Sequence, residues 1–149
     1  MGAYLNAHLN HMDRLLKTRV VARDELEIIQ RGDGYVIAGE VHIEGGAVVR
    51  VHKEVRVVRK TGKTTYVQTK VYSYNVSIPG AGSVIRHDGP DDHRPYHHVH
   101  RYRPLDGDRE GTLERVDLDD VPTLAEVLTD AYGWCMTHRE AIDALQGEP

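Results

Sequence analysis

Short β-like runs broken by glycine fill the stretch from Glu25 to Ile85, and they constrain the fold more than any other feature. In order, the runs are "ELEIIQR", "YVIAGEVHI", "AVVRVHKEVRVVR", "TTYVQTKVYSYNVSI" and "SVIR", and the breaks between them are "GDG", "EGG", "TGK" and "PGAG". Glycines supply the positive φ angles that tight reversals need. Because nothing of helical length separates the runs, they predict consecutive antiparallel strands rather than a parallel sheet.

Alternation along two of these runs indicates which side of the sheet is the core. In each run one side is rich in valine, and this side is expected to be buried. The polar sides would carry Arg50, Glu54 and Arg56 in one strand, and Lys70 and Tyr72 in the next. We therefore expect Glu54 and Tyr72 on a common polar face. That face is either a binding surface or an ordinary solvated sheet face.

Helical periodicity appears at both ends of the chain. Apolar residues near the start recur at spacings of three and four: Leu5, Leu9, Met12 and Leu16. A second apolar stripe near the end has the same periodicity: Leu124, Val127, Leu128, Ala131 and Cys135. Thr123 and Glu126 have the spacing of a capping box at the start of that second helix.

Together these patterns predict one α+β domain over residues 1–149. It consists of a helix over 1–18, an antiparallel sheet with a His-rich loop over 25–103, and a helix over 122–145. The sheet is expected to have about five or six strands.

Composition limits the classes of function. The net charge is −4, yet residues 50–70 hold seven Lys or Arg against one acid, and residues 104–130 hold nine acids against two arginines. The basic stretch is either a surface for RNA or an acidic partner, or a solvated face balanced by the acidic segment. Cys135 is the only cysteine, which excludes an intramolecular disulfide and a four-cysteine zinc site. The chain has neither a secretory signal nor an apolar run of membrane length, so we expect a cytoplasmic protein.

The segment "DDHRPYHHVH" carries the chemistry, and the sequence leaves three interpretations open. In an extended strand His98 and His100 point to one side and His97 to the other. Such an H-x-H pair presents two imidazoles to a metal, with Asp88, Asp92 or His93 as a third ligand. However, the glutamate of the cupin-type pattern and the HExxH pattern of zinc proteases are both absent. Besides this metal site, the segment can be a polar loop whose side chains hydrogen-bond to nearby groups or contact a partner.

The remaining interpretation is acid–base catalysis, because imidazole titrates near neutral pH. One histidine would remove a proton from the 2′-hydroxyl of RNA, and another would protonate the leaving oxygen. Arg86 would neutralise the charge on the phosphate in the transition state. Asp88 would orient an imidazole.

The chain from about residue 40 to 102 resembles the TumE family, the toxin components of small bacterial and archaeal toxin–antitoxin pairs. The similar elements are a glycine turn, a strand with a glutamate, a tyrosine-rich strand, an R-x-D motif and an HHxH-like group. Here these are Gly46, Glu54, Tyr72 and Tyr74, Arg86 and Asp88, and finally His93, His97, His98 and His100. The resemblance implies a growth-inhibiting toxin, with ribonuclease activity as the natural expectation, and a cognate DNA-binding antitoxin as partner.

The expected function is therefore a His-dependent ribonuclease toxin that needs no cofactor. Its expected catalytic residues are Arg86, Asp88, His97, His98 and His100, with Glu54 and Tyr72 as outer candidates. Its expected RNA-binding residues are Arg50, Arg56 and Lys70. Two alternatives remain: a divalent metal such as zinc held by Asp88, His98 and His100, or a non-catalytic interaction protein. The sequence leaves open whether copies of the chain form a homo-oligomer.

Overall fold

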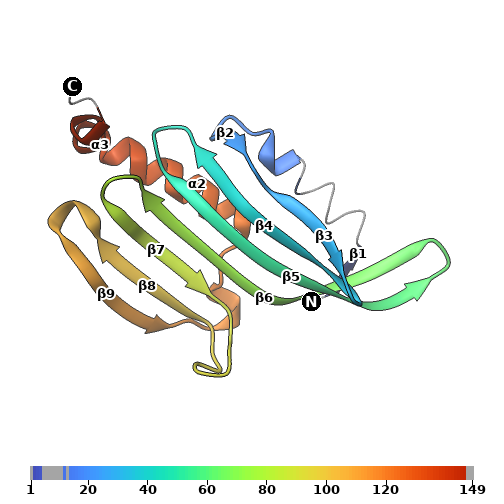
Figure 1. Cartoon of the computed structure of the whole chain (residues 1–149). Coiled ribbons are helices and arrows are strands. Elements are labelled where there is room, and N and C mark those ends of the chain that lie inside the picture. The colour runs from blue at the N-terminus through green and yellow to red at the C-terminus, as the bar shows by residue number, and fades with distance from the viewer. Residues whose placement is uncertain (1, 5–11, 13, 147–149) are drawn as a thin grey trace.

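An antiparallel sheet carries helices on one of its two faces (Figure 1). The computed structural model describes residues 2–4, 12 and 14–146. Within them the strands are β1 (Gly2–Tyr4), β2 (Val21–Asp24), β3 (Glu27–Arg31), β4 (Gly34–Ile43), β5 (Val48–Thr61), β6 (Thr64–Ile78), β7 (Gly82–Asp88), β8 (His98–Arg103) and β9 (Asp108–Arg115). The α-helices are α2 (Leu124–Thr137) and α3 (Arg139–Gln146), and short 3-10 helices cover Pro104–Asp106 and Leu118–Asp120.

From β4 to β9 each strand pairs with the next strand of the chain. In addition, β2 and β3 both pair with β4, and β1 pairs with β6. The predicted α+β class with an antiparallel sheet is confirmed, but nine strands occur in the described ranges rather than five or six. One added strand is β9, whose sequence "DREGTLER" lacks apolar alternation and is held by its pairing with β8. None of the helices in these ranges has the length and apolar character needed to cross a membrane.

The core lies between α2 and the sheet face that this helix covers, which we call the helix face. The predicted stripe of the C-terminal segment is confirmed, because the buried residues of α2 are Leu124, Val127, Leu128, Ala131 and Cys135. They share one apolar cluster with Val49 and Val51 of β5 and Val76 of β6. Full burial of such a side chain contributes about 1.5–3 kcal/mol. The valine-rich side of β5 is therefore the core side, as the alternation predicts.

The opposite face of the sheet, which we call the open face, bears polar side chains. Cross-strand pairs place His52 beside Ser73, Ser73 beside Asp88, and Asp88 beside His98. Paired residues of antiparallel strands point to the same face. Because Tyr74, the neighbour of Ser73, is buried in the core, this row of polar residues faces away from the helices.

A one-residue bulge in β6 changes which tyrosines face the core. In the register of β5 and β6, Glu54 pairs with Val71 and Val55 pairs with Thr69. Lys70, which lies between these two residues of β6, therefore has no partner in β5. Since side chains alternate along a strand, the extra residue reverses the two faces beyond it. Tyr72 consequently lies on the helix face and Glu54 on the open face. The prediction that these two share a face is wrong.

The predicted C-terminal helix is divided in two at His138. Thr123 and Glu126 form the predicted capping box where α2 begins. At its end, Nδ1 of His138 lies 2.9 Å from the Trp134 carbonyl oxygen, and the two rings stack with centroids 4.0 Å apart. The backbone N–H of His138 donates to the same carbonyl at 3.0 Å, but the φ of −110° and ψ of 22° of this residue lie outside the helical region. The single helix over 122–145 is thus replaced by α2 and α3.

The predicted helix over residues 1–18 is wrong at its start, where β1 pairs with β6. Met12 and residues 14–16 have helical backbone conformation, and Met12 and Leu15 belong to the core. The remainder of the prediction, over residues 5–11 and 13, lies outside the described residues.

Gly39 in β4 is a position where any side chain is expected to destabilise the fold. Its φ is +141°, and a Cβ atom there would lie 2.3 Å from the Glu25 carbonyl oxygen. Gly80 is the matched control, because its φ is also positive but an added Cβ meets nothing within 4 Å. Urea titration is expected to show that Gly39→Ala lowers the free energy of unfolding by about 3 kcal/mol and Gly80→Ala by about 1 kcal/mol. Equal losses would contradict the steric explanation.

Candidate active site

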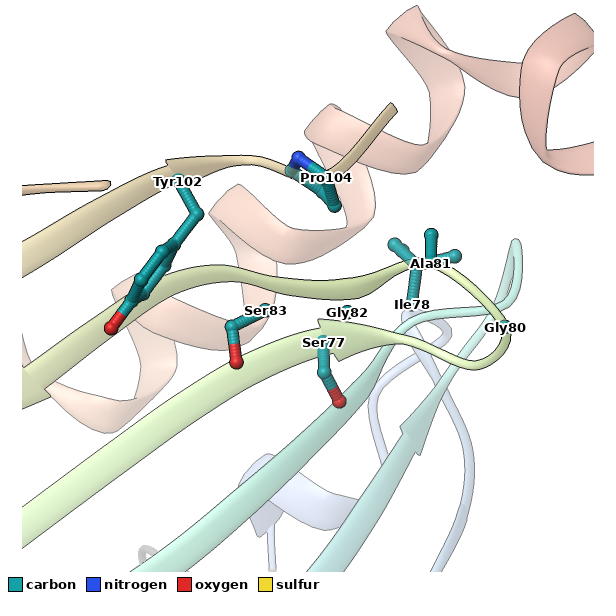
Figure 2. A pocket seen from close by; sticks show the side chains of 8 residues that line it. All are labelled: Ser77, Ile78, Gly80, Ala81, Gly82, Ser83, Tyr102 and Pro104. Atoms are coloured by element: carbon teal, nitrogen blue, oxygen red, sulfur yellow. The ribbon is translucent and has the colours of Figure 1, made fainter. Parts of the chain in front are cut away.

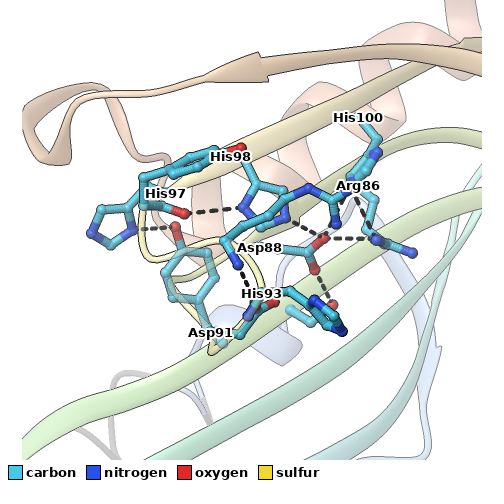
Figure 3. Close-up of polar contacts among 11 residues, drawn as sticks. Arg86, Asp88, Asp91, His93, His97, His98 and His100 are labelled. Carbon is cyan, nitrogen blue, oxygen red and sulfur yellow. Dashed lines mark hydrogen bonds and ion pairs between the residues drawn. The ribbon is translucent and has the colours of Figure 1, made fainter.

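Four of the predicted site residues converge on the open face, at the end of β7 and the start of β8. The register pairs Asp88 with His98 and Arg86 with His100, so all four side chains point to the same side. Figure 3 shows their polar contacts meeting around the Asp88 carboxylate. The sheet register, rather than a loop, therefore assembles this group, which we call the Asp88 cluster: Arg86, Asp88, His98 and His100.

Asp88 is the centre of the cluster. Ser73 donates its hydroxyl to Oδ1 at 2.7 Å, and Arg86 donates Nε to Oδ2 at 2.7 Å. Nε2 of His98 lies 3.3 Å from Oδ2, and Nε2 of His100 lies 3.6 Å from it. The Asp88 side chain is only 13% exposed. A carboxylate with this little access to water needs such partners to offset the cost of its burial.

His98 lies beneath the surface of the cluster, with a side chain that is 1% exposed. Its Nδ1 is 3.0 Å from the Tyr96 carbonyl oxygen. Because a carbonyl oxygen only accepts, Nδ1 carries a proton and Nε2 faces the Asp88 carboxylate. The space between Nε2 and Oδ2 therefore suits a proton or a metal cation.

His100 is the more accessible imidazole, with a side chain that is 14% exposed. Arg86 donates Nη2 to its Nε2 at 3.1 Å. Burial, and then the charge of Arg86, hold the pKa of His100 below its ordinary value of 6.5. Since a guanidinium only donates, Nε2 is the unprotonated nitrogen. His100 is thus a neutral base at pH 7, with its lone pair directed toward a guanidinium.

The aromatic neighbours of the cluster form a row along β8. Every second residue here has a ring on the open face, and each ring contacts the next: Tyr96, His98, His100 and Tyr102. The centroid separations are 5.7, 5.3 and 6.2 Å. Arg115 of β9 lies over the Tyr96 ring at 5.3 Å. The histidines are thereby continuous with an aromatic surface.

His97 and Tyr72 do not belong to the cluster, although both were predicted catalytic residues. His97 points to the opposite side from His98, as strand alternation predicts, and its Nδ1 shares a 2.8 Å hydrogen bond with the Tyr72 hydroxyl. Burial, and then the charge of Asp88, raise the pKa of Tyr72 to about 12. This pair helps to line a separate pocket on the helix face, between β6 and the start of α2.

The other predicted residues are spread over the sheet. Glu54 is on the open face but pairs with His52 at 3.1 Å rather than with the cluster. Arg50 pairs with Glu40 at 3.1 Å, and Arg56 pairs with Asp33 at 3.3 Å. Both arginines are more than half exposed, so these ion pairs contribute little to stability.

Lys70, the third predicted RNA-binding residue, is the exposed bulge residue of β6. Asp88, Asp92 and His93 were the candidates for a third metal ligand, and of these Asp88 lies beside His98 and His100. Asp92 and His93 lie in the turn before β8, where Asp91 accepts hydrogen bonds from the backbone N–H groups of His93 and Arg94.

Sequence reasoning missed three side chains near the cluster: Ser73, Tyr96 and Tyr102. The two tyrosines have a signal in the sequence, because residues 96, 98, 100 and 102 alternate along one strand face. Ser73 has none, because the bulge at Lys70 decides which face it occupies.

The cluster also contains a set of metal-ligand types. One ligand atom each of Asp88, His98 and His100 lies within 4.8 Å of the others. Two imidazoles and a carboxylate suit a divalent transition metal. However, Arg86 already donates both to the carboxylate and to the lone pair of His100. A metal ion at that position would have to displace this guanidinium.

This chain matches no protein-family model, no curated protein and no solved structure.

Proposed function

We propose that the chain cleaves RNA at the Asp88 cluster without a metal ion. The observation that carries this proposal is the pairing of a neutral, partly exposed imidazole, His100, with a guanidinium, Arg86, at 3.1 Å. A base beside a fixed positive charge is what a phosphodiester needs at its attacking hydroxyl and its phosphate oxygens. RNA is preferred to DNA because its 2′-hydroxyl supplies the nucleophile.

The protein itself offers no activated nucleophile at this position. The nearest hydroxyl of the cluster, that of Ser73, donates to Asp88 rather than to an imidazole. A serine needs an adjacent base to attack a phosphate ester. The attacking oxygen therefore comes from the substrate.

The reaction is a transesterification within the RNA. When substrate binds, the Arg86 guanidinium turns from Nε2 of His100 to the phosphate. The freed Nε2 then takes the proton of the 2′-hydroxyl, and the 2′-oxygen forms a bond to phosphorus. The bond from phosphorus to the 5′-oxygen breaks, and water protonates that oxygen. The resulting hydroxide recombines with the proton that His100 releases. The products are a 2′,3′-cyclic phosphate and a free 5′-hydroxyl.

Arg86 and His98 have different roles in this scheme. The guanidinium of Arg86 is 39% exposed, and its charge helps to keep the pKa of His100 low in the free protein. Its contact with Asp88 can hold it in place while it turns from His100 to the phosphate. His98 is buried and cannot reach substrate, so it is a positioning residue that holds the Asp88 carboxylate from the other side. The expected catalytic role of His98 is thus replaced by a supporting one.

The direct test is cleavage of a labelled RNA by protein purified without a histidine tag, in the presence of excess EDTA. We expect cleavage that EDTA does not reduce, with cyclic phosphate and 5′-hydroxyl ends. No cleavage of any RNA under these conditions would overturn the proposal.

The pH dependence of cleavage has a defined sign. His100 acts only when neutral, and its pKa lies below 6.5, so kcat/KM is expected to stay near its maximum at pH 7 and to fall only in more acidic solution. Removal of the Arg86 charge by Arg86→Gln should move the acidic limb of the profile to higher pH, besides lowering the rate. An unchanged position of that limb would contradict the assignment of His100 as the base.

The cellular role that follows is that of a toxin neutralised by a DNA-binding antitoxin encoded beside it. What supports this role is the resemblance of residues 40–102 to TumE-like toxins, together with the proposed RNA chemistry. Induction of the wild-type chain should arrest growth, and co-expression of the neighbouring gene product should relieve the arrest. Equal growth of cells with and without induction, at confirmed expression, would count against the toxin role.

Metal binding is the second candidate, and the ligand set of Asp88, His98 and His100 favours it. Elemental analysis of untagged protein separates the two proposals. A stoichiometric divalent metal, lost in His98→Ala together with activity, would replace the metal-free proposal.

A further inference from the structure

We infer that the RNA is single-stranded and that the base next to the cleaved phosphate stacks on Tyr102, in a pocket beside the Asp88 cluster. This inference rests on the proposed function, because it assigns the substrate of the same site. The pocket lies where β6 turns into β7, next to the end of β8 (Figure 2).

Tyr102 lies close enough to His100 for one nucleotide of the RNA to contact both residues. Its ring is nearly parallel to that of His100, with an interplanar angle of 8° and centroids 6.2 Å apart. Two residues along a strand span about 7 Å. A nucleotide whose phosphate contacts Arg86 and His100 therefore has its base within reach of the Tyr102 ring.

The lining of the pocket fits a base rather than a phosphate. Its eight lining residues carry no charge: Ser77, Ile78, Gly80, Ala81, Gly82, Ser83, Tyr102 and Pro104. A phosphate would need a cation there, and the guanidinium of Arg86 lies in the neighbouring Asp88 cluster instead. An uncharged planar group with polar edges is the ligand that such a surface takes.

Hydroxyl groups are available to bind the edge of the base. In Figure 2 the side-chain oxygens of Ser77, Ser83 and Tyr102 all extend toward the lower part of the view. The contact of Ser77 Oγ with the Val48 carbonyl oxygen is long, at 3.5 Å, so a ligand can replace it. Each hydroxyl both donates and accepts, so the pocket suits any base with modest selectivity.

The pocket is also open enough for an aromatic ring. Its volume is about 500 Å³, within the range of about 300–1,000 Å³ typical of small-molecule sites. A Cβ atom added at Gly80 or Gly82, which both line the pocket, would meet nothing within 4 Å, so no other group crowds the turn at these positions.

The need for an unpaired strand follows from this geometry. In a duplex each base is stacked between its neighbours and its edge is paired, so it cannot lie on a protein ring. Aromatic side chains bind the faces of splayed bases in single strands. A duplex would therefore lose the Tyr102 contact.

The test measures binding without cleavage, by fluorescence anisotropy with a uridine oligomer whose 2′-hydroxyls are methylated. Without a 2′-hydroxyl this probe cannot be cut. We expect Tyr102→Ala to raise the Kd about tenfold, because one base loses its stacking partner. Tyr102→Phe should stay within about threefold of wild type, since it keeps the ring. The same sequence annealed to its complement should bind the wild-type protein more weakly than the single strand.

Two further variants make the result decisive. Tyr102→Leu keeps apolar volume over Gly111, so it should fold even if Tyr102→Ala does not. Because leucine has no ring to stack on, this variant should also show a Kd that is about tenfold higher. Tyr66→Ala removes a tyrosine at the far end of β6, beneath Arg59 at 4.2 Å, and should leave the Kd unchanged.

The outcomes separate this inference from the proposed function. Unchanged binding by Tyr102→Leu, or equal affinity for duplex, overturns the stacking pocket even if the protein cleaves RNA. A Tyr102-dependent Kd in a protein that cleaves no RNA supports the pocket and overturns the catalytic proposal. No binding of the single-stranded probe by wild type overturns the pocket.

Discussion

His100→Ala is expected to reduce the rate of RNA cleavage by about 100- to 10,000-fold, the usual contribution of a general base. His100 is the histidine of the Asp88 cluster that combines solvent access with a lowered pKa. Its removal leaves Arg86 able to bind the phosphate, so kcat should fall much more than the affinity for RNA. Single-turnover cleavage beside binding of the uncleavable probe separates the two effects.

His97→Ala is the matched control, because His97 and His100 lie three positions apart and point to opposite faces of the sheet. His97 contacts Tyr72 on the helix face, and its removal should lower cleavage by less than about threefold, within the ordinary effect of a surface substitution. If His97→Ala and His100→Ala reduce cleavage equally, the active surface is not the open face.

Asp88→Ala is expected to cause the largest loss of stability of any substitution in the Asp88 cluster. It would leave Arg86 and the buried His98 without the carboxylate that they share. A buried polar group that loses its hydrogen-bond partner costs about 1–3 kcal/mol, and Nε2 of His98 would be left in this position. Urea unfolding followed by circular dichroism would measure this loss as a lower midpoint with an unchanged slope.

Asp143→Ala provides the comparison for an aspartate in an exposed ion pair. Its side chain is 70% exposed, and its contact with Arg139 is 4.0 Å long. The expected change is below about 0.5 kcal/mol. A loss for Asp88→Ala as small as that for Asp143→Ala would mean that the cluster is hydrated and does not hold the sheet together.

Local patterns predicted the parts of the fold that depend on neighbouring residues alone. The capping box at Thr123 and the apolar stripe of α2 both follow from helical spacing, and both are present. The separation of His97 from His98 and His100 follows from the period of two in a strand. These relations need no knowledge of the rest of the chain.

The failures depend on contacts between distant segments. The faces of Tyr72 and Ser73 are set by the bulge at Lys70, which exists only in the pairing of β6 with β5. Strand β1 is defined by its hydrogen bonds to β6, about sixty residues away in the register. Alternation within one strand carries no information about a bulge in its pairing, so the shared face of Glu54 and Tyr72 was predicted wrongly.

The order of elements in this chain has a consequence for its synthesis. Strands β4 to β9 pair in chain order, so each can join the sheet soon after it leaves the ribosome. Helix α2, which packs five buried side chains against the helix face, begins only at Leu124. Until that last segment emerges, the nascent sheet exposes its valine-rich surface to solvent and to other chains. Slow translation or truncation before α2 should therefore favour aggregation, and a chaperone that binds extended apolar segments should recognise this intermediate.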